Sequence, residues 1–279
     1  MSKSHSIVVL ATDMDGTFIP LDGNEQNSAD LVELQSELDC NHIALLYVTG
    51  RHHELVLDAI RSHGLPSPPW MICDVGASIY HSENGRNYDL VQEYADHLGQ
   101  LVGDHDRSRI VQCLGAIANL RMQEDEKQSR YKISYYCGAA TIDKSVTAIR
   151  HQLGQDKAPY RVIDSVDPFT GDGLIDLLPT GVSKAYALKW WAIHTGTDQA
   201  AITFAGDSGN DLAALTAGYC SIIVGNADES VVAEAQRAHD SAGWTDRLVI
   251  AKAHATQRRL RRTAKLSKVV RAASLHPRH

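Results

Sequence analysis

Two acidic residues follow a short apolar segment near the start of the chain. Residues 7–12 read Ile-Val-Val-Leu-Ala-Thr, and Asp13 and Asp15 come next, ahead of Gly16 and Thr17. In extended backbone, residues two apart face the same way, so both carboxylates can face one ligand. One carboxylate can attack phosphorus, while the other gives a proton to the departing oxygen and takes one from water. An ordinary turn is the alternative interpretation, because Asp and Gly are common in turns.

A second acidic segment follows a later apolar run. Residues 200–205 are largely apolar, and Asp207 and Asp211 come after them at the start of a helical pattern. Carboxylate oxygens are hard ligands that suit Mg²⁺, which binds few protein carboxylates and keeps several waters. We therefore expect Asp13 and Asp207, with the carbonyl of Asp15, to contact Mg²⁺, and Asp211 to orient a bound water. Capping of the following helix is the alternative role for Asp207 and Asp211.

Three further residues have types and positions suited to binding phosphate. Lys184 lies at the start of a helical pattern, where its ammonium would neutralise charge on the phosphate and on Asp13. Most lysines, however, are simply solvated. Thr49 and Gly50 follow an apolar segment and offer a hydroxyl and backbone N–H groups to phosphate oxygens, although a Thr-Gly pair is also an ordinary entry into a loop.

Strand and helix patterns alternate around these residues. Continuous apolar runs predict buried strands, and leucines at helical spacing predict helices. The predicted strands cover residues 7–12, 42–48, 70–73, 174–178, 200–205 and 220–224, with helices over 28–38, over 52–62 and from 184. This alternation is typical of the α/β class, here a doubly wound, Rossmann-like parallel sheet. Such sheets bind ligands at the carboxyl ends of their strands, which is where the acidic segments fall.

The composition changes between residues 82 and 172, which are rich in Glu, Asp, Gln and Arg. Helical patterns near 89–102 and 108–119 are followed by strand patterns at 130–137 and 159–164. We therefore predict an inserted α+β domain over 82–172. The remaining predicted units are a core made of residues 1–81 and 173–250, and a tail over 251–279.

Charge is distributed unevenly along the chain. The net charge is −7, yet nine of the 27 Lys and Arg residues, and none of the 34 Asp and Glu residues, fall within 251–279. A basic tail can bind an acidic partner, nucleic acid or a membrane surface. A solvated appendage, or a helix packed on the acidic core, explains the same pattern more simply. We therefore predict no nucleic-acid partner.

Two features favour a cytoplasmic protein. The five cysteines are widely spaced and form no C-x-x-C pair, which argues against a disulfide framework and against a structural zinc site. The apolar run at residues 7–10 is too short for a signal peptide or a membrane span. We expect a soluble chain without a membrane span.

Together, these motifs resemble those of the haloacid dehalogenase superfamily of phosphatases. In order and spacing, the matching segments are Asp13-x-Asp15-Gly16-Thr17, Thr49-Gly50-Arg51, Lys184 and Gly206-Asp207-Ser208-Gly209-Asn210-Asp211. The resemblance covers residues 7–245 and implies Mg²⁺ as the cofactor. It also implies that residues 82–172 form a cap, which closes over the active site of the catalytic core and selects the substrate.

Within this superfamily, the chain is most similar to sucrose-phosphate phosphatases and to their relatives that act on mannosylfructose phosphate. The similarity is carried by Tyr47-Val48-Thr49-Gly50-Arg51, Asp74-Val75-Gly76-Ala77-Ser78-Ile79-Tyr80, Tyr131-Lys132-Ile133-Ser134-Tyr135 and Asp176-Leu177-Leu178-Pro179. Two positions depart from the pattern of these enzymes. Ser78 stands where an acidic residue is frequent, and Ala185 stands where Gly is frequent, so the sugar is less well defined than the chemistry.

The resemblance implies a role for each motif residue. Asp13 becomes the nucleophile, Asp15 the acid and base, and Lys184 the third catalytic group. Substrate contacts fall to Thr49, Gly50, Arg51, Lys132 and Asn210. The metal ligands fall to Asp13, Asp15, Asp207 and Asp211.

The leading hypothesis is hydrolysis of a sugar phosphate, foremost sucrose 6-phosphate, through an aspartyl-phosphate. Three alternatives remain open at this point. The chain resembles mannosylfructose-phosphate phosphatases, and it also resembles phosphomannomutases, which pass the phosphoryl group to a sugar hydroxyl. It would otherwise be a non-catalytic module that docks on a synthase making the sugar phosphate, a partner that is also possible for the enzyme itself.

Overall fold

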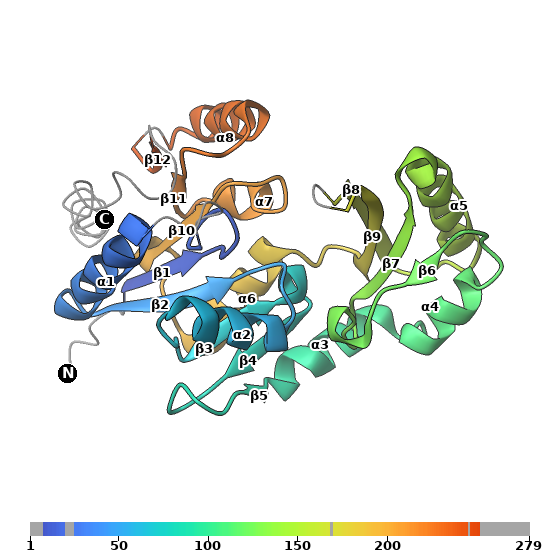
Figure 1. Cartoon of the computed structure of the whole chain (residues 1–279), viewed down its shortest axis with the longest axis horizontal. Helices are drawn as coiled ribbons and strands as arrows, with labels where there is room; N and C mark the ends of the chain where they lie inside the picture. Colours follow the sequence, from blue (N-terminus) through green and yellow to red (C-terminus); the bar gives the residue numbers. More distant parts are fainter. Residues whose placement is uncertain (1–7, 20–24, 168–169, 245, 252–279) are drawn as a thin grey trace.

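The computed structural model describes residues 8–19, 25–167, 170–244 and 246–251. Two β-sheets dominate the part of the chain that it describes (Figure 1). The predicted basic tail falls outside the described residues, apart from Ala251.

The large sheet has the order β12-β11-β10-β1-β2-β3-β4-β5. Its strands are β1 (Val8–Thr12), β2 (Ile43–Val48), β3 (Trp70–Cys73), β4 (Ser78–His81), β5 (Asp89–Leu90), β10 (Ile202–Gly206), β11 (Cys220–Ile223) and β12 (Leu248–Ile250). The strands from β12 to β3 pair in parallel, whereas β4 and β5 pair antiparallel at one edge. This arrangement confirms the predicted α/β class.

Eight α-helices are seen in the described ranges. They are α1 (Glu25–Cys40), α2 (His53–His63), α3 (Gln92–Val102), α4 (Arg107–Leu114), α5 (Ile142–Gln155), α6 (Lys184–Thr195), α7 (Leu212–Leu215) and α8 (Glu229–Ser241). None of these helices combines the length and the apolar character needed to cross a membrane.

Alternate residues of the parallel strands pack into two separate apolar clusters. One cluster joins Val9, Leu46 and Phe204 to residues of α6, α7 and α8. The other joins Leu10 and Tyr47 to residues of α1 and α2. Successive side chains of a strand point to opposite faces, so helices cover both faces of the sheet, as the doubly wound fold requires.

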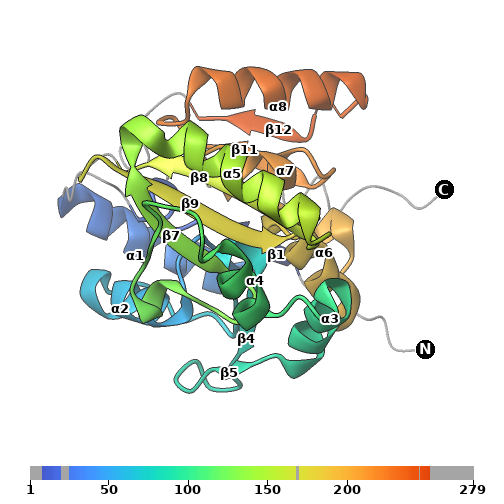
Figure 2. The ribbon, with the colours of Figure 1, turned by 90° about the vertical axis from the view of Figure 1, so that its right-hand side faces the viewer.

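The small sheet is antiparallel, with the order β6-β7-β9-β8. Its strands are β6 (Arg121–Met122), β7 (Ile133–Gly138), β8 (Tyr160–Val166) and β9 (Asp172–Pro179). Figure 2 shows α5 lying across this sheet, and α4 packs beside α5. Of this sheet, β6, β7 and β8 lie within residues 82–172, the range predicted for the insert, whereas β9 extends beyond it to Pro179.

One strand assignment and one helix assignment made from the sequence are wrong. Residues 174–178 were predicted as a strand of the parallel sheet, but they form β9 of the small sheet. Residues 89–90 were predicted to begin a helix of the insert, but they form β5 and pair with β4 in the large sheet. A short apolar run such as Leu-Ile-Asp-Leu-Leu fits either kind of sheet, because its letters do not specify a partner strand.

A left-handed loop links three parts of the core. Asp74, Val75 and Gly76 have φ angles of 55°, 58° and 97°. The N–H of Asp74 donates to the carbonyl of Arg51, and the N–H of Val75 donates to that of Thr49. The hydroxyl of Tyr94, on α3, donates to the carbonyl of Gly76 at 2.6 Å. This loop therefore ties the Thr49 segment to the helix that leads into the insert.

We expect Gly76→Ala to destabilise the protein by about 2–5 kcal/mol, because a left-handed φ and an overpacked contact each cost stability. A Cβ atom on Gly76 would lie 2.3 Å from the carbonyl oxygen of Ser183. Gly64→Ala is the matched control, since Gly64 has a φ of 61° but open space around it. Urea unfolding of both variants measures the difference, and equal losses would show that the Ser183 contact is unimportant.

Candidate active site

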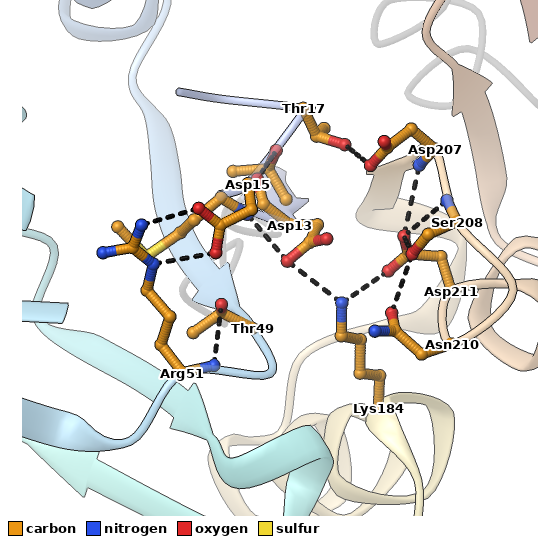
Figure 3. A network of polar contacts seen from close by, with 12 residues as sticks. Asp13, Asp15, Thr17, Thr49, Arg51, Lys184, Asp207, Ser208, Asn210 and Asp211 are labelled. Atoms are coloured by element: carbon orange, nitrogen blue, oxygen red, sulfur yellow. Dashed lines mark hydrogen bonds and ion pairs between the residues drawn. The ribbon is translucent and has the colours of Figure 1, made fainter. Parts of the chain in front are cut away.

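Three parallel strands and one helix bring the acidic segments together. Thr12, the last residue of β1, pairs with Ala205 of β10 and with Tyr47 of β2, so the loops that follow these strands leave side by side. Figure 3 shows side chains from these loops converging near the start of α6. The site therefore lies at the carboxyl edge of the parallel sheet, as the sequence predicted.

A buried lysine joins two of the aspartates. Nζ of Lys184 lies 3.0 Å from Oδ1 of Asp13 and 2.7 Å from Oδ1 of Asp211, and the Lys184 side chain is 0% exposed (Figure 3). Burial alone would lower the pKa of Lys184, but the two carboxylates raise it above its usual value. The lysine is therefore charged, and it holds Asp13 in place.

Burial shifts the pKa of Asp13, the proposed nucleophile, in the opposite direction from that of Lys184. It raises the pKa of Asp13 to about 7, and Lys184 opposes this rise. Oδ1 of Asp13 accepts hydrogen bonds from Lys184 and from the N–H of Met14. This arrangement leaves Oδ2 as the oxygen of Asp13 that can reach a ligand.

Asp211 acts as a structural link within the acidic segment. Its Oδ2 accepts from the N–H groups of Asp207 and Ser208, at 3.1 Å each, and from the Ser208 hydroxyl at 2.9 Å. A Cβ atom on Gly206 would lie 2.6 Å from Cγ of Asp211, so glycine permits this close approach. Asp211 is fully buried and so holds both Lys184 and the loop that carries Asp207.

The acidic residues fit a magnesium site. Asp13, Asp207 and Asp211 each offer an oxygen within 4.8 Å of the others. Asp207 is oriented by Thr17, whose hydroxyl donates to its Oδ1 at 2.6 Å, and by Asn226, whose amide donates to its Oδ2 at 3.0 Å. Since Lys184 and the loop N–H groups already occupy Asp211, Asp13 and Asp207 are the side chains best placed to hold Mg²⁺.

Asp15 forms an ion pair with Arg51. Nε and Nη2 of Arg51 donate to the two carboxylate oxygens of Asp15 at 2.8 and 2.6 Å. Nη1 of Arg51 donates to the carbonyl of Leu55 at 3.2 Å, which anchors the guanidinium to α2. The hydrogen bond with Asp15 raises the pKa of Arg51. Arg51, predicted as a substrate contact, thus also holds the predicted acid and base.

The other predicted phosphate contacts lie at the same edge. Thr49 is fully buried, and its hydroxyl accepts from the N–H of Arg51 at 3.2 Å. Gly50 and Asn210 lie close together, since a Cβ atom on Gly50 would be 3.9 Å from Nδ2 of Asn210. Oδ1 of Asn210 accepts from the Ser208 hydroxyl at 3.0 Å.

A cavity of about 460 Å³ lies between these loops and the small sheet. The core contributes acidic residues and the glycines beside them, and β8 and β9 contribute residues of their uncovered face, such as Ile163 and Asp176. Lys132, which the sequence predicted as a sugar contact, lines the cavity, and its Nζ lies 3.5 Å from Oδ2 of Asp176. The cavity therefore joins the acidic site to polar groups of the insert.

Several site residues had not been predicted from the sequence. Thr17 belongs to the first motif, but its contact with Asp207 is visible only in three dimensions. Asn226 follows β11 in a segment without a motif. Gln123 and Lys127 come from a loop that ordinary polar composition does not distinguish from a solvated one.

The profile of the sucrose-6F-phosphate phosphohydrolase family matches residues 6–258. The chain belongs to this family. The match places the chain in the haloacid dehalogenase superfamily, as the motifs predicted.

Two individual proteins are similar to most of this chain. A putative HAD-like hydrolase of Nitrosococcus oceani is 32% identical over 82% of this chain and 62% of its own length. A glucosylglycerol-phosphate synthase of Pseudomonas anguilliseptica is 29% identical over 81% of this chain but only 27% of its own length. The chain thus spans less than two thirds of either relative.

Solved structures share the fold. The sucrose-phosphatase of Synechocystis sp. PCC6803, in complex with sucrose and phosphate, has a TM-score of 0.69 at 23% identity. The match covers 94% of this chain and 99% of that one. The haloacid dehalogenase-like hydrolase yhjK of Bacillus subtilis has a TM-score of 0.65 at 18% identity, over 94% of this chain and 92% of that one.

We expect Lys184→Met to abolish activity and to destabilise the protein by about 3–5 kcal/mol, because removing one partner leaves buried carboxylates unpaired. Adding Asp211→Asn to this variant should recover part of the lost stability but no activity. Urea unfolding measures both effects. If Lys184→Met alone were as stable as the wild type, that result would contradict the proposed charge balance.

Metal binding should depend on pH through Asp13. Its pKa is about 7 in the folded chain against 3.8 ordinarily, so the folded, metal-free protein keeps a proton that the unfolded chain releases. Stability without metal therefore falls as pH rises from about 4 to 7. Mg²⁺ held by Asp13 would compete with this proton, so we expect it to raise the melting temperature more at pH 8 than at pH 5.5.

Melting curves in EDTA and in Mg²⁺ at both pH values provide this measurement. Asp13→Asn is the control, and it should flatten most of the pH dependence because residue 13 then binds no proton. An equal effect of Mg²⁺ at both pH values in the wild type would contradict the prediction.

Proposed function

We propose that the protein is a Mg²⁺-dependent phosphatase that hydrolyses a sugar phosphate, with sucrose 6F-phosphate as its foremost substrate. The observation that carries this proposal is the position of Asp13, which is held by Lys184 and lies within reach of Asp207 at the mouth of a polar cavity. An oriented carboxylate beside a cation and a metal site is what attack on phosphorus requires. Family membership supports the substrate class.

The first step forms a bond between Oδ2 of Asp13 and phosphorus, and breaks the bond between phosphorus and the sugar oxygen. Lys184 holds Oδ1 of Asp13, so the other oxygen faces the phosphate. Gly50 and Asn210 would contact the phosphate oxygens through N–H groups. Bound Mg²⁺ would offset the negative charge that develops on the phosphoryl group.

Asp15 supplies the proton that the departing sugar oxygen takes up. Its side chain is 49% exposed and lies at the cavity, so it can reach both the sugar and water. Asp15 then removes a proton from the water that attacks the aspartyl-phosphate, which frees phosphate and restores Asp13.

The part of the cavity formed by the insert suits a ligand rich in hydroxyl groups. Lys132, Asp176 and Gln123 place donors and acceptors opposite the acidic site. The Synechocystis structure contains sucrose and phosphate, which supports a sucrose phosphate as the substrate. The relative named as a glucosylglycerol-phosphate synthase makes glucosylglycerol phosphate the second candidate, and such a synthase a candidate partner.

We expect the purified protein with Mg²⁺ to release phosphate from sucrose 6F-phosphate at least about tenfold faster, in kcat/KM, than from glucose 6-phosphate or mannose 6-phosphate, because specific hydrogen bonds to substrate hydroxyls discriminate by this much. A phosphate-release assay with these esters, mannosylfructose phosphate and glucosylglycerol phosphate measures the preference. Equal rates on simple hexose phosphates would contradict the assignment.

Asp13→Asn is the catalytic control for this assay. It keeps the shape of the side chain but removes the attacking oxygen, so activity should be lost while the circular dichroism spectrum is unchanged. Near-normal activity in a folded Asp13→Asn variant would remove Asp13 from the mechanism. Transfer of phosphate to a second sugar, without release of free phosphate, would identify a phosphotransferase instead.

A further inference from the structure

A second cavity, of about 390 Å³, adjoins the active site. His52 lines both cavities. The loop over residues 123–132 also contributes to both: Gln123, Lys127 and Lys132 line the first, whereas Gln128 and its neighbours line the second. The two cavities therefore adjoin at His52 and at the loop over residues 123–132.

Asp74 is a buried carboxylate that lines this cavity with one oxygen unused. Its Oδ2 accepts from the Ser78 hydroxyl at 2.6 Å. Its Oδ1 is buried and has no hydrogen-bond partner among the described residues, although Asp74 is only 1% exposed. Buried polar atoms in native proteins are almost always paired, so a missing partner calls for an explanation.

Two histidines beside Asp74 share this property. Nε2 of His52 and Nε2 of His53 are buried, and neither finds a hydrogen-bond partner in the described part of the chain, although Nε2 of His52 lies 3.5 Å from Oε2 of Glu54. Together with Asp74, they present polar atoms from the start of α2 and from the left-handed loop. A ligand with several hydroxyl groups would pair these atoms, whereas an apolar ligand would leave them unpaired.

The rest of the lining favours a neutral ring-shaped ligand. His53 stacks on Tyr80 with ring centroids 4.1 Å apart, and Tyr94 and Tyr131 add further aromatic surface. Four carboxylates line the cavity, on Glu54, Asp74, Asp125 and Glu126, against one arginine. This charge disfavours a second phosphate group, so the cavity complements a hydroxyl-rich, uncharged unit.

We propose that this cavity receives an unphosphorylated sugar unit of the substrate, and that Asp74 is a specificity-determining residue that accepts a hydrogen bond from one of its hydroxyls. The inference deepens the proposed function and rests on it, because the phosphorylated unit must occupy the neighbouring catalytic cavity. A substrate of two sugar units would span both cavities past His52.

Kinetics on two substrates tests this assignment. Asp74→Asn should lower kcat/KM for sucrose 6F-phosphate at least about tenfold, the usual effect of losing a hydrogen bond to a charged group. It should leave kcat/KM for fructose 6-phosphate, which lacks the second unit, within twofold of the wild type. Glu234→Gln is the matched control, because Glu234 is an exposed carboxylate on α8, and it should change neither value.

Folding of the variant is checked separately. Burial raises the pKa of Asp74 to about 6, so its ionised form is disfavoured in the folded chain and lowers stability above that pH. Asp74→Asn should therefore melt no lower than the wild type at pH 7.5. If it does melt lower, Ser78→Ala serves as a second variant, because it removes the hydrogen bond that orients Asp74 and should weaken the same discrimination.

Calorimetric binding of unphosphorylated sucrose separates this inference from the proposed function. The wild type should bind sucrose, and Asp74→Asn should bind it at least about tenfold more weakly. If no phosphate ester is hydrolysed but sucrose binding depends on Asp74, the proposed function fails and the sugar site stands. An equal loss of kcat/KM on both phosphate esters, or no loss on either, would overturn the role of Asp74.

Discussion

The charge balance around Lys184 is the constraint on which the rest of the site depends. A fully buried ammonium is costly unless it is paired, and here it is paired with Asp13 and Asp211. Each of these carboxylates is in turn costly without the lysine. The sheet must therefore place the ends of β1 and β10, and the start of α6, within hydrogen-bond distance of one another. The same convergence positions Asp207 to hold a metal beside Asp13.

The left-handed loop extends this constraint toward the insert. It is bonded to the backbone of the Thr49 segment, it lies against Ser183 at the start of α6, and it accepts a hydrogen bond from Tyr94 of α3. Non-glycine residues in this conformation are strained, and strain of this kind concentrates at functional sites. The loop places Asp74 at the second cavity.

The sequence predicted the fold class and most of the acidic site for a simple physical reason. Parallel strands end at a common edge, so Asp13, Thr49 and Asp207 had to meet once their strands were recognised. The partner of an isolated strand was not predictable in the same way, and β9 was assigned to the wrong sheet. The pairing of Asp15 with Arg51 depends on side-chain directions that spacing does not encode. The unpaired state of Asp74 likewise depends on a backbone conformation set by distant contacts.

The residues that face the sugar and the residues that carry the chemistry lie in different segments of the chain. The continuous segment from Val91 to Pro179 contains the whole small sheet, together with Lys132 and Asp176. Asp13, Lys184, Asp207 and Asp211 all lie outside it. A single genetic exchange of that segment between relatives would thus replace the part of the cavity that the small sheet contributes. The acidic residues and Lys184 would be unchanged. Asp74 is the exception, because it belongs to the core and would not be exchanged. It would therefore limit which inserts from relatives are compatible with this core.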